Sequence, residues 1–282
     1  MAVTALTEPA RLMAGKRGLI MGVANDHSIA WGIARTLAGA GAEIAFTYQG
    51  DAQGKRVKPL AESVSSRLVL PCDVENEAEV GAVFAALDEA WGSLDFLVHS
   101  LAYSDRNELK GRYVDTSRQN FISTLAISCY SFTEVARRAA AMMKNGGALV
   151  TLTYGGATRV MPNYNVMGVA KAALEASVRY LAADLGKDKI RVNAISAGPM
   201  RTLAGSAVGD ARLVFKWNKA HSPLKTNVEL DHIGGAALYL LSDLSGGVTG
   251  EIHFVDAGYH LIGMPPTADL KGWIAPENGD SD

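Results

Sequence analysis

Short runs of apolar residues alternate along the chain with longer stretches in which apolar residues recur at helical spacing. The short runs predict buried strands, and the longer stretches predict amphipathic helices. We expect strands at 17–23, 43–48, 67–71, 94–99, 148–153, 190–195 and 251–255. We expect helices at 28–40, 51–65, 75–91, 117–143, 163–185, 206–220 and 229–241.

This alternation of strand and helix also predicts how the strands pair. A helix between two strands lets the chain cross back over the sheet, so neighbouring strands run parallel and helices cover both faces. We therefore expect one α/β domain, a Rossmann-like, doubly wound, seven-stranded parallel sheet. No linker or change of composition divides the chain, so we place this domain at 15–264, between an N-terminal arm (1–14) and a C-terminal tail (265–282).

Composition excludes several classes of protein. A net charge of −2 over 282 residues gives no electrostatic reason to expect nucleic acid as a partner. No run of about eighteen apolar residues is present, and the first residues lack the apolar core of a secretory signal. We expect a cytoplasmic protein without a membrane span. Cys72 and Cys129 lie in apolar segments and are expected to be free thiols, and the spacing of the six histidines predicts no metal site.

Candidate catalytic side chains gather where the strand at 148–153 ends and the next helix begins. Tyr154 follows that strand, and Tyr164 and Lys171 are seven residues apart. Seven residues make about two helical turns, so both side chains should leave one face of the helix. An ammonium beside a phenol stabilises the phenolate and makes the hydroxyl a better acid. This edge of the sheet is also where open α/β folds bind ligands.

The first strand leads through a glycine-containing turn into a helix. Such a turn, beginning at Gly22, can place a diphosphate against backbone N–H groups and the N-terminus of the helix. Ser28 either caps this helix or donates to the phosphate. Because the spacing departs from Gly-x-Gly-x-x-Gly, a plain strand-to-helix turn stays open as an alternative.

Two further strand ends support a dinucleotide. Gln49, after the second strand, can bond ribose hydroxyls, and the carboxylate usual at this place is absent. Lys55 and Arg56 lie nearby and could contact a ribose phosphate, so NADPH stays an alternative cofactor. Asp73 and Val74 follow the third strand and suit an adenine ring, although Asp73 can equally cap the following helix.

Together these segments resemble the short-chain dehydrogenase/reductase superfamily, and specifically its divergent enoyl-[acyl-carrier-protein] reductase branch of the FabI type. The resemblance covers roughly residues 14–262. Six residues separate Tyr164 from Lys171, whereas ordinary members of the superfamily have three, and this difference favours the enoyl reductases over the carbonyl reductases. The strings that carry the resemblance are Gly22-x5-Ser28-Ile29-Ala30, Phe46-Thr47-Tyr48-Gln49, Cys72-Asp73-Val74, His99-Ser100, residues 162–168, residues 191–199 and Arg201-Thr202-Leu203-Ala204.

The resemblance implies a reaction and roles for these residues. NADH would pass a hydride to the β-carbon of a trans-2-enoyl thioester in fatty acid biosynthesis. Tyr164 would stabilise the charge that develops on the thioester oxygen, Lys171 would bind the nicotinamide ribose, and Tyr154 would line the pocket and assist proton delivery or substrate fit. Ser104 would contact the substrate. The implied cofactor contacts are Gly22, Ser28, Ile29, Gln49, Asp73, Val74, Leu101, Lys171, Met200, Arg201, Thr202, Leu203 and Ala204.

The resemblance also implies partners. Residues 202–221 are expected to form a lid over the substrate. Arg212, Lys216 and Lys219 would share one helix face, on which an acidic acyl carrier protein could dock, although a solvated face explains them too. A homotetramer is expected, with the helices at 117–143 and 163–185 as interface elements. A 3-oxoacyl or carbonyl reductase and a non-catalytic dinucleotide sensor remain the alternatives.

Overall fold

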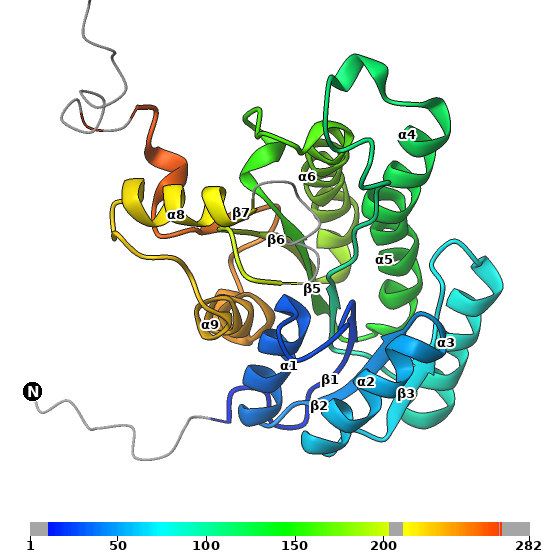
Figure 1. Cartoon of the computed structure of the whole chain (residues 1–282). Coiled ribbons are helices and arrows are strands. Elements are labelled where there is room, and N and C mark those ends of the chain that lie inside the picture. The colour runs from blue at the N-terminus through cyan, green and yellow to red at the C-terminus, as the bar shows by residue number, and fades with distance from the viewer. Residues whose placement is uncertain (1–10, 203–210, 265, 267–282) are drawn as a thin grey trace, which may run out of the picture.

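The apolar runs form parallel strands in the order that the sequence predicts. The computed structural model describes residues 11–202, 211–264 and 266 (Figure 1). Within them the strands lie side by side in the order β3-β2-β1-β4-β5-β6-β7, and every neighbouring pair is parallel. The strands are β1 (Arg17–Met21), β2 (Glu43–Tyr48), β3 (Leu68–Pro71), β4 (Phe96–His99), β5 (Gly147–Thr153), β6 (Ile190–Ala197) and β7 (Ile252–Val255). The predicted doubly wound sheet is confirmed.

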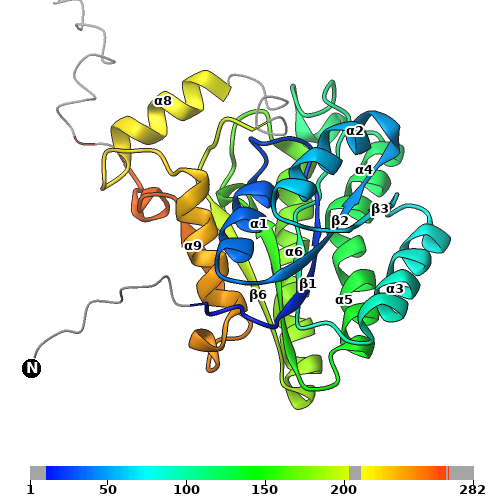
Figure 2. The ribbon, with the colours of Figure 1, turned by 90° about the horizontal axis from the view of Figure 1, so that it is seen from below.

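Helices cover both faces of this sheet, as Figures 1 and 2 show. Helices α1, α2 and α9 pack on one face, and α3, α5 and α6 pack on the other. The strand order reverses between β1 and β4, which is where a doubly wound sheet opens a crevice at its carboxyl edge. The described helices are α1 (Ile29–Gly39), α2 (Gly50–Ser63), α3 (Glu77–Trp91), α4 (Arg118–Leu125), α5 (Ser131–Met142), α6 (Asn165–Leu185), α8 (Ala211–His221) and α9 (Leu230–Leu241).

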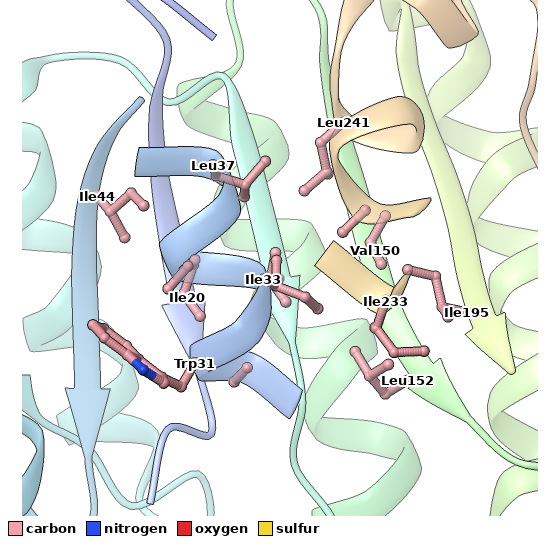
Figure 3. Packing of buried hydrophobic residues seen from close by; sticks show 14 of the residues in the cluster. Ile20, Trp31, Ile33, Leu37, Ile44, Val150, Leu152, Ile195, Ile233 and Leu241 are labelled. Carbon is pink, nitrogen blue, oxygen red and sulfur yellow. The ribbon is translucent and has the colours of Figure 1, made fainter. Parts of the chain in front are cut away.

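Alternate residues of each central strand supply the two cores. In β1, Ile20 is fully buried on the α1 and α9 side, while Leu19 and Met21 are buried on the α3, α5 and α6 side. Figure 3 shows the first of these cores, in which Ile33 of α1 and Ile233 of α9 meet residues of β5 and β6. Because both faces are apolar, the strands read in the sequence as continuous apolar runs.

The helix predicted at 117–143 is not one α-helix. It consists of α4 and α5 joined by a π-helical turn at Ala126–Tyr130. In this turn the Ser128 hydroxyl bonds both the N–H and the carbonyl of Tyr103, at 3.0 and 3.2 Å. The Ser131 hydroxyl donates to the Ile127 carbonyl at 2.6 Å. Serine hydroxyls that compete for the backbone hydrogen bonds of the helix explain the interruption.

The other predicted helices begin and end within a few residues of the observed ones. None of the helices in residues 11–202 and 211–264 is both long and apolar enough to cross a bilayer. The helix predicted at 206–220 corresponds to α8, which begins at Ala211 in the described part of the chain. Residues 203–210 lie outside that part. The proposed arm at 1–14 and tail at 265–282 lie mostly outside it as well.

Two glycines let α1 and α9 approach each other closely. A Cβ added at Gly234 of α9 would lie 2.1 Å from the Thr36 hydroxyl oxygen and 3.1 Å from the Gly32 carbonyl oxygen. A Cβ added at Gly32 of α1 would lie 2.7 Å from the Cβ of Leu230. All three distances are shorter than ordinary van der Waals contact, so the packing of these helices requires glycine at both positions.

We predict that Gly234→Ala lowers the free energy of unfolding by about 1–3 kcal/mol, since the added methyl group overpacks the contact between α1 and α9. The matched control is Gly235→Ala, one residue along the same helix, where an added Cβ meets nothing within 4 Å. This control should gain up to about 1 kcal/mol from helix propensity. Urea unfolding of the two variants measures the difference, and equal midpoints would contradict the prediction.

Candidate functional site

The carboxyl edge of the sheet brings together the predicted site residues that the structure describes. Gly22 follows β1, Gln49 follows β2, Asp73 lies beyond β3, and Tyr154 follows β5. These residues are far apart in the sequence, and the strand order places their turns along one edge.

The turn after β1 is shaped by its glycine and its serine. Gly22 has a φ of +102°, and a Cβ there would lie 2.1 Å from the Ser100 carbonyl oxygen, so a larger residue does not fit. Ser28 occupies the N-cap position of α1, but its hydroxyl accepts from the N–H groups of Ala24 and Asn25, at 3.0 Å each, and makes no capping bond. The serine therefore holds the turn that leads to the helix N-terminus.

The structure excludes one of the two interpretations of Asp73, the helix cap. The N-cap of α3 is Asn76, whose Oδ1 accepts from the N–H groups of Ala78 and Glu79. Asp73 does not cap that helix; its Oδ2 accepts from Gln49 Nε2 at 2.9 Å. The side chains predicted for ribose and adenine contacts thus meet at the carboxyl ends of β2 and β3.

Three predicted cofactor contacts are half-buried apolar side chains. Ile29 at the start of α1 packs against the core on the α1 and α9 side. Val74 and Leu101 pack against the core on the opposite face. Each follows a strand or a turn at the carboxyl edge, so the core holds these side chains in place.

The two tyrosines lie edge to face at the end of β5. Their ring centroids are 5.2 Å apart, with an angle of 72° between the ring planes. Tyr164 is the N-cap residue of α6, and a Cβ at Gly156 would lie 2.4 Å from its ring. The glycine after the strand therefore leaves the space that the Tyr164 ring occupies.

Lys171 is buried and joins α6 to β5. Its side chain is largely enclosed, with 5% of the residue exposed, and its Nζ donates to the Leu152 carbonyl oxygen at 2.8 Å. Burial lowers the pKa of Lys171 to about 8, while Cys129 and Glu175 act in the opposite direction. The lysine therefore titrates close to neutral pH.

The pKa values of the phenols differ from the sequence expectation. Burial raises the pKa of Tyr164, and Tyr154 raises it further. Burial raises the pKa of Tyr154 to about 12, with Tyr259 and Asp256 adding to the effect. The expectation that the Lys171 ammonium makes Tyr164 a better acid is wrong for this structure, because burial and Tyr154 both raise the pKa of this phenol. Both phenols therefore keep their proton at neutral pH and can donate a hydrogen bond.

A small cavity lies next to Tyr154. It is lined by Met161, by Pro199 after β6, and by Asp256 and His260 after β7, among others. Asp256 Oδ1 lies 3.0 Å from His260 Nδ1, and the same carboxylate accepts from the N–H groups of Gly258 and His260. Sequence reasoning missed this pair, although its spacing of four residues was a usable signal.

The remaining predicted contacts lie around this edge. Ser104 is buried, and its hydroxyl donates to Asn120 Oδ1 at 3.2 Å, so a neighbouring amide already engages it. Met200 is half-buried against the core, and the Thr202 N–H donates to the Met200 carbonyl at 2.9 Å. The guanidinium of Arg201 lies over the ring of Phe215, 4.8 Å from its centroid. Leu203, Ala204 and most of the first half of the expected lid lie outside the described residues.

The residues present fit a dinucleotide. Within the described residues, the Leu152 carbonyl is the one hydrogen-bond acceptor recorded for the Lys171 ammonium, which has three donors. Two donors therefore remain for ligand hydroxyls. The turn at Gly22 ends at the N-terminus of α1, where no acidic residue occupies the first turn, and this suits a diphosphate.

Cys72 and His99 are buried and uncharged at neutral pH. Cys72 and Cys129 are free, and burial raises the pKa of Cys72 to about 12, which makes it unreactive. Burial also lowers the pKa of His99 to about 3. No group of three or more potential ligands that could hold a metal ion occurs among the described residues.

Comparison with known proteins gives one consistent result. A family model described as Enoyl-(Acyl carrier protein) reductase matches residues 22–260. A relative from Rhizobium meliloti, enoyl-[acyl-carrier-protein] reductase [NADH] 2, is 65% identical over 260 residues, which are 92% of this chain and 97% of the relative.

Solved structures agree with this result. The crystal structure of FabI from Candidatus Liberibacter asiaticus has a TM-score of 0.89 at 59% identity, and the match covers 90% of this chain and 98% of that one. An enoyl-(acyl-carrier-protein) reductase from Anaplasma phagocytophilum, in complex with NAD, has a TM-score of 0.88 at 60% identity. That match covers 90% of this chain and 97% of the other.

We predict a pH-dependent stability difference between the wild type and Lys171→Met. The pKa of Lys171 is about 8 in the folded protein and 10.5 when unperturbed, so the unfolded chain binds the proton more tightly. Stability should therefore rise with pH across this window relative to the variant, by at most about 1.4 kcal/mol per pH unit. Chemical unfolding of both proteins between pH 7.5 and 10 measures the difference. A difference that does not change with pH would contradict the prediction.

Proposed function

The chain belongs to the enoyl-[acyl-carrier-protein] reductase family, and on that premise we propose that it reduces the trans-2 double bond of enoyl-[acyl-carrier-protein] thioesters with NADH in fatty acid biosynthesis. The observation that supports this most is the grouping at the end of β5. Two protonated phenols lie edge to face there, and a buried lysine with free donors lies on the same edge of the sheet. This set suits a carbonyl oxygen that becomes negatively charged beside a dinucleotide.

Tyr164 is the proposed oxyanion stabiliser. When bound, reduced nicotinamide supplies the hydride that adds to the β-carbon of the substrate. Negative charge then develops on the thioester oxygen, and the Tyr164 hydroxyl donates its hydrogen bond to that oxygen. The raised pKa of Tyr164 supports this role, since a phenol that keeps its proton remains a donor throughout the neutral range. A proton added at the α-carbon completes the reduction.

Lys171 and Tyr154 have supporting roles in this proposal. The Lys171 ammonium donates to the nicotinamide ribose while it is held by the Leu152 carbonyl. Tyr154 packs on the Tyr164 ring, lines the cavity described above and contributes to substrate fit or proton delivery. We assign substrate contacts to Ser104, Tyr154 and Tyr164.

The other cofactor contacts follow the carboxyl edge of the sheet. The turn from Gly22 to Ser28 holds the diphosphate against the N-terminus of α1, and Gln49 and Asp73 bond the adenosine portion. We keep NADPH as a less favoured cofactor, because Lys55 and Arg56 lie in α2 directly after Gln49. The contacts completing the proposed set are Ile29, Val74, Leu101, Met200, Arg201, Thr202, Leu203 and Ala204.

The partner and the assembly are also proposals. The reductase domain spans 15–264, with a lid at about 202–221. Acyl carrier protein docks on α8, where Arg212, Lys216 and Lys219 are exposed. We propose a cytoplasmic homotetramer. Exposed apolar side chains on α4, the π turn and α6 support its interface, namely Ile122, Tyr130, Val169 and Tyr180.

We predict that Tyr164→Phe lowers kcat by about 10²–10³-fold, the usual effect of losing one oxyanion donor, while the Kd for NADH stays within twofold. Lys171→Ala should instead raise the Kd for NADH. Initial rates at 340 nm with a 2-enoyl thioester, for NADH and NADPH, and NADH titration by fluorescence measure both effects. A 3-oxoacyl thioester run in parallel tests the carbonyl reductase alternative, and near-wild-type behaviour of both variants would refute the assigned roles.

We predict that Lys216→Glu raises KM for an enoyl thioester of acyl carrier protein several-fold, since the substitution places a negative charge against an acidic partner. KM for the matching coenzyme A thioester, which lacks the carrier protein, should change much less. Lys187→Glu, in the short helical turn after α6, is the control for a change of net charge. An equal effect on both substrates would show that α8 does not dock the carrier.

A further inference from the structure

Each turnover of the proposed reaction consumes one proton as well as one hydride. Tyr154 is a proposed source of that proton, and a phenol that has given up its proton must regain one before the next turnover. A bound substrate covers the side of the phenol that it contacts. The replacement proton therefore has to arrive from another side of Tyr154.

The cavity beside Tyr154 offers such a side. Its volume of about 30 Å³ exceeds the roughly 10–15 Å³ that one water molecule needs. Tyr154, Asp256 and Tyr259 all line it. Burial is the main cause that raises the pKa of Tyr154, and Tyr259 and Asp256 add to the effect, as expected for groups that lie close together.

A buried amide gives this cavity an unused hydrogen-bond acceptor. Asn218 of α8 lines the cavity, and only 1% of the residue is exposed. Its Nδ2 donates to Asn227 Oδ1, and Asn227 Nδ2 donates to the Phe215 carbonyl, each at 3.1 Å, so this chain of bonds fixes which end of Asn218 is the oxygen. That oxygen has no partner among the described residues. Because a buried polar atom without a partner is costly, it favours a water molecule in the cavity.

The turn after β7 adds a histidine that is held by a carboxylate. Asp256 Oδ1 lies 3.0 Å from His260 Nδ1, and the Phe254 ring stacks on the imidazole with the ring centroids 4.1 Å apart. A carboxylate at Nδ1 selects the tautomer with its hydrogen there and leaves Nε2 to exchange protons. The His260 side chain lines the cavity and is 31% exposed, so it has access to solvent as well.

We propose that His260 conducts protons from solvent through this cavity to Tyr154. The inference deepens the proposed function and rests on it, because it takes Tyr154 as the group that protonates the α-carbon. The Tyr154 O–H bond breaks as the C–H bond forms at the α-carbon of the enolate, and a phenolate is left. A water in the cavity gives the phenolate a proton and takes one from His260 Nε2. Solvent then reprotonates the imidazole, whose positive charge the Asp256 carboxylate stabilises.

The charged groups next to His260 in the described part of the chain are Asp256 and Arg159. The Arg159 guanidinium, which comes from the segment after β5, donates to the carbonyls of His260 and Ile262 and so holds the backbone of the turn. Asp256 is the charged group that contacts the imidazole itself. The side chains that α8 brings to this place, Asn218 and Trp217, are uncharged, and Trp217 Nε1 donates to the Tyr259 hydroxyl at 3.0 Å.

The test separates proton transfer from packing. His260→Phe keeps an aromatic ring on Phe254 but has no nitrogen. Asn218→Leu removes the buried acceptor at nearly the same size. His253→Gln is the control, since His253 lies in β7 and is not among the residues that line the cavity. We measure kcat with a 2-enoyl thioester from pH 5.5 to 9, and the Kd for NADH by fluorescence.

We expect His260→Phe and Asn218→Leu to lower kcat at pH 6 by about tenfold, less than the 10²–10⁴-fold typical of an acid that touches the reacting atoms. The Kd for NADH and the rate of His253→Gln should stay near wild type. In the wild type kcat should fall as the pH rises through about 5–8, where imidazoles lose their proton, because fewer molecules then carry the charged donor. His260→Phe should lose this dependence. If it does not fold, His260→Gln tests the same expectation.

A second measurement does not depend on turnover. NMR of protein with ¹³Cζ-labelled tyrosine follows the Tyr154 ring, and Tyr154→Phe identifies its resonance. In the wild type this resonance should move with pH between about 5 and 8, as the imidazole across the cavity changes charge. In His260→Phe that movement should be absent, and in His253→Gln it should remain.

Two results would overturn the inference. One is a kcat and a pH profile in His260→Phe that equal those of an active wild type. The other is a Tyr154 resonance with the same response to pH in the wild type and in His260→Phe. A wild type that reduces no enoyl thioester would instead refute the proposed function, and the NMR comparison would still decide whether His260 and Tyr154 are coupled.

Discussion

The site depends on a positive charge that the fold removes from water. Lys171 is almost fully enclosed between α6 and β5, and burial makes its ammonium less stable than in solvent. The Leu152 carbonyl oxygen, which accepts from the ammonium at 2.8 Å, compensates for part of this lost solvation. This bond is part of the contact of α6 with the end of β5. The same contact that solvates the ammonium therefore also sets where Tyr154 and Tyr164 lie.

The rest of the fold supports that contact. The two faces of the sheet carry separate apolar cores, so β5 is held from both sides while its carboxyl end stays open. Close approach of α1 and α9 at Gly32 and Gly234 stabilises the face opposite α6. Strands β1 and β4, where the strand order reverses, place Gly22 and Ser100 next to each other. A rigid edge results, on which residues from distant parts of the chain keep fixed positions.

The sequence predicted the fold because its signal is long-range and redundant: seven apolar runs separated by helical patterns admit few topologies. It did not predict the π turn at Ala126–Tyr130, because that turn depends on where Ser128 meets Tyr103, a contact between distant elements. Likewise Asn76, and not Asp73, caps α3, which short-range preference alone leaves undecided. The sequence does show that Glu175 shares the helix face of Lys171. Its bond to Thr153 appears only in the three-dimensional structure.

The one wrong chemical expectation clarifies the proposed role of Tyr164. Proximity of an ammonium in the sequence suggested a more acidic phenol, yet burial raises the pKa of Tyr164 and of Tyr154. A sequence gives spacing along a helix but no measure of lost solvation, which is the larger effect here. An acidic phenol would give up its proton and could no longer donate a hydrogen bond. A phenol that keeps its proton remains a donor as charge builds up on a substrate oxygen, and this is what stabilisation of an oxyanion requires.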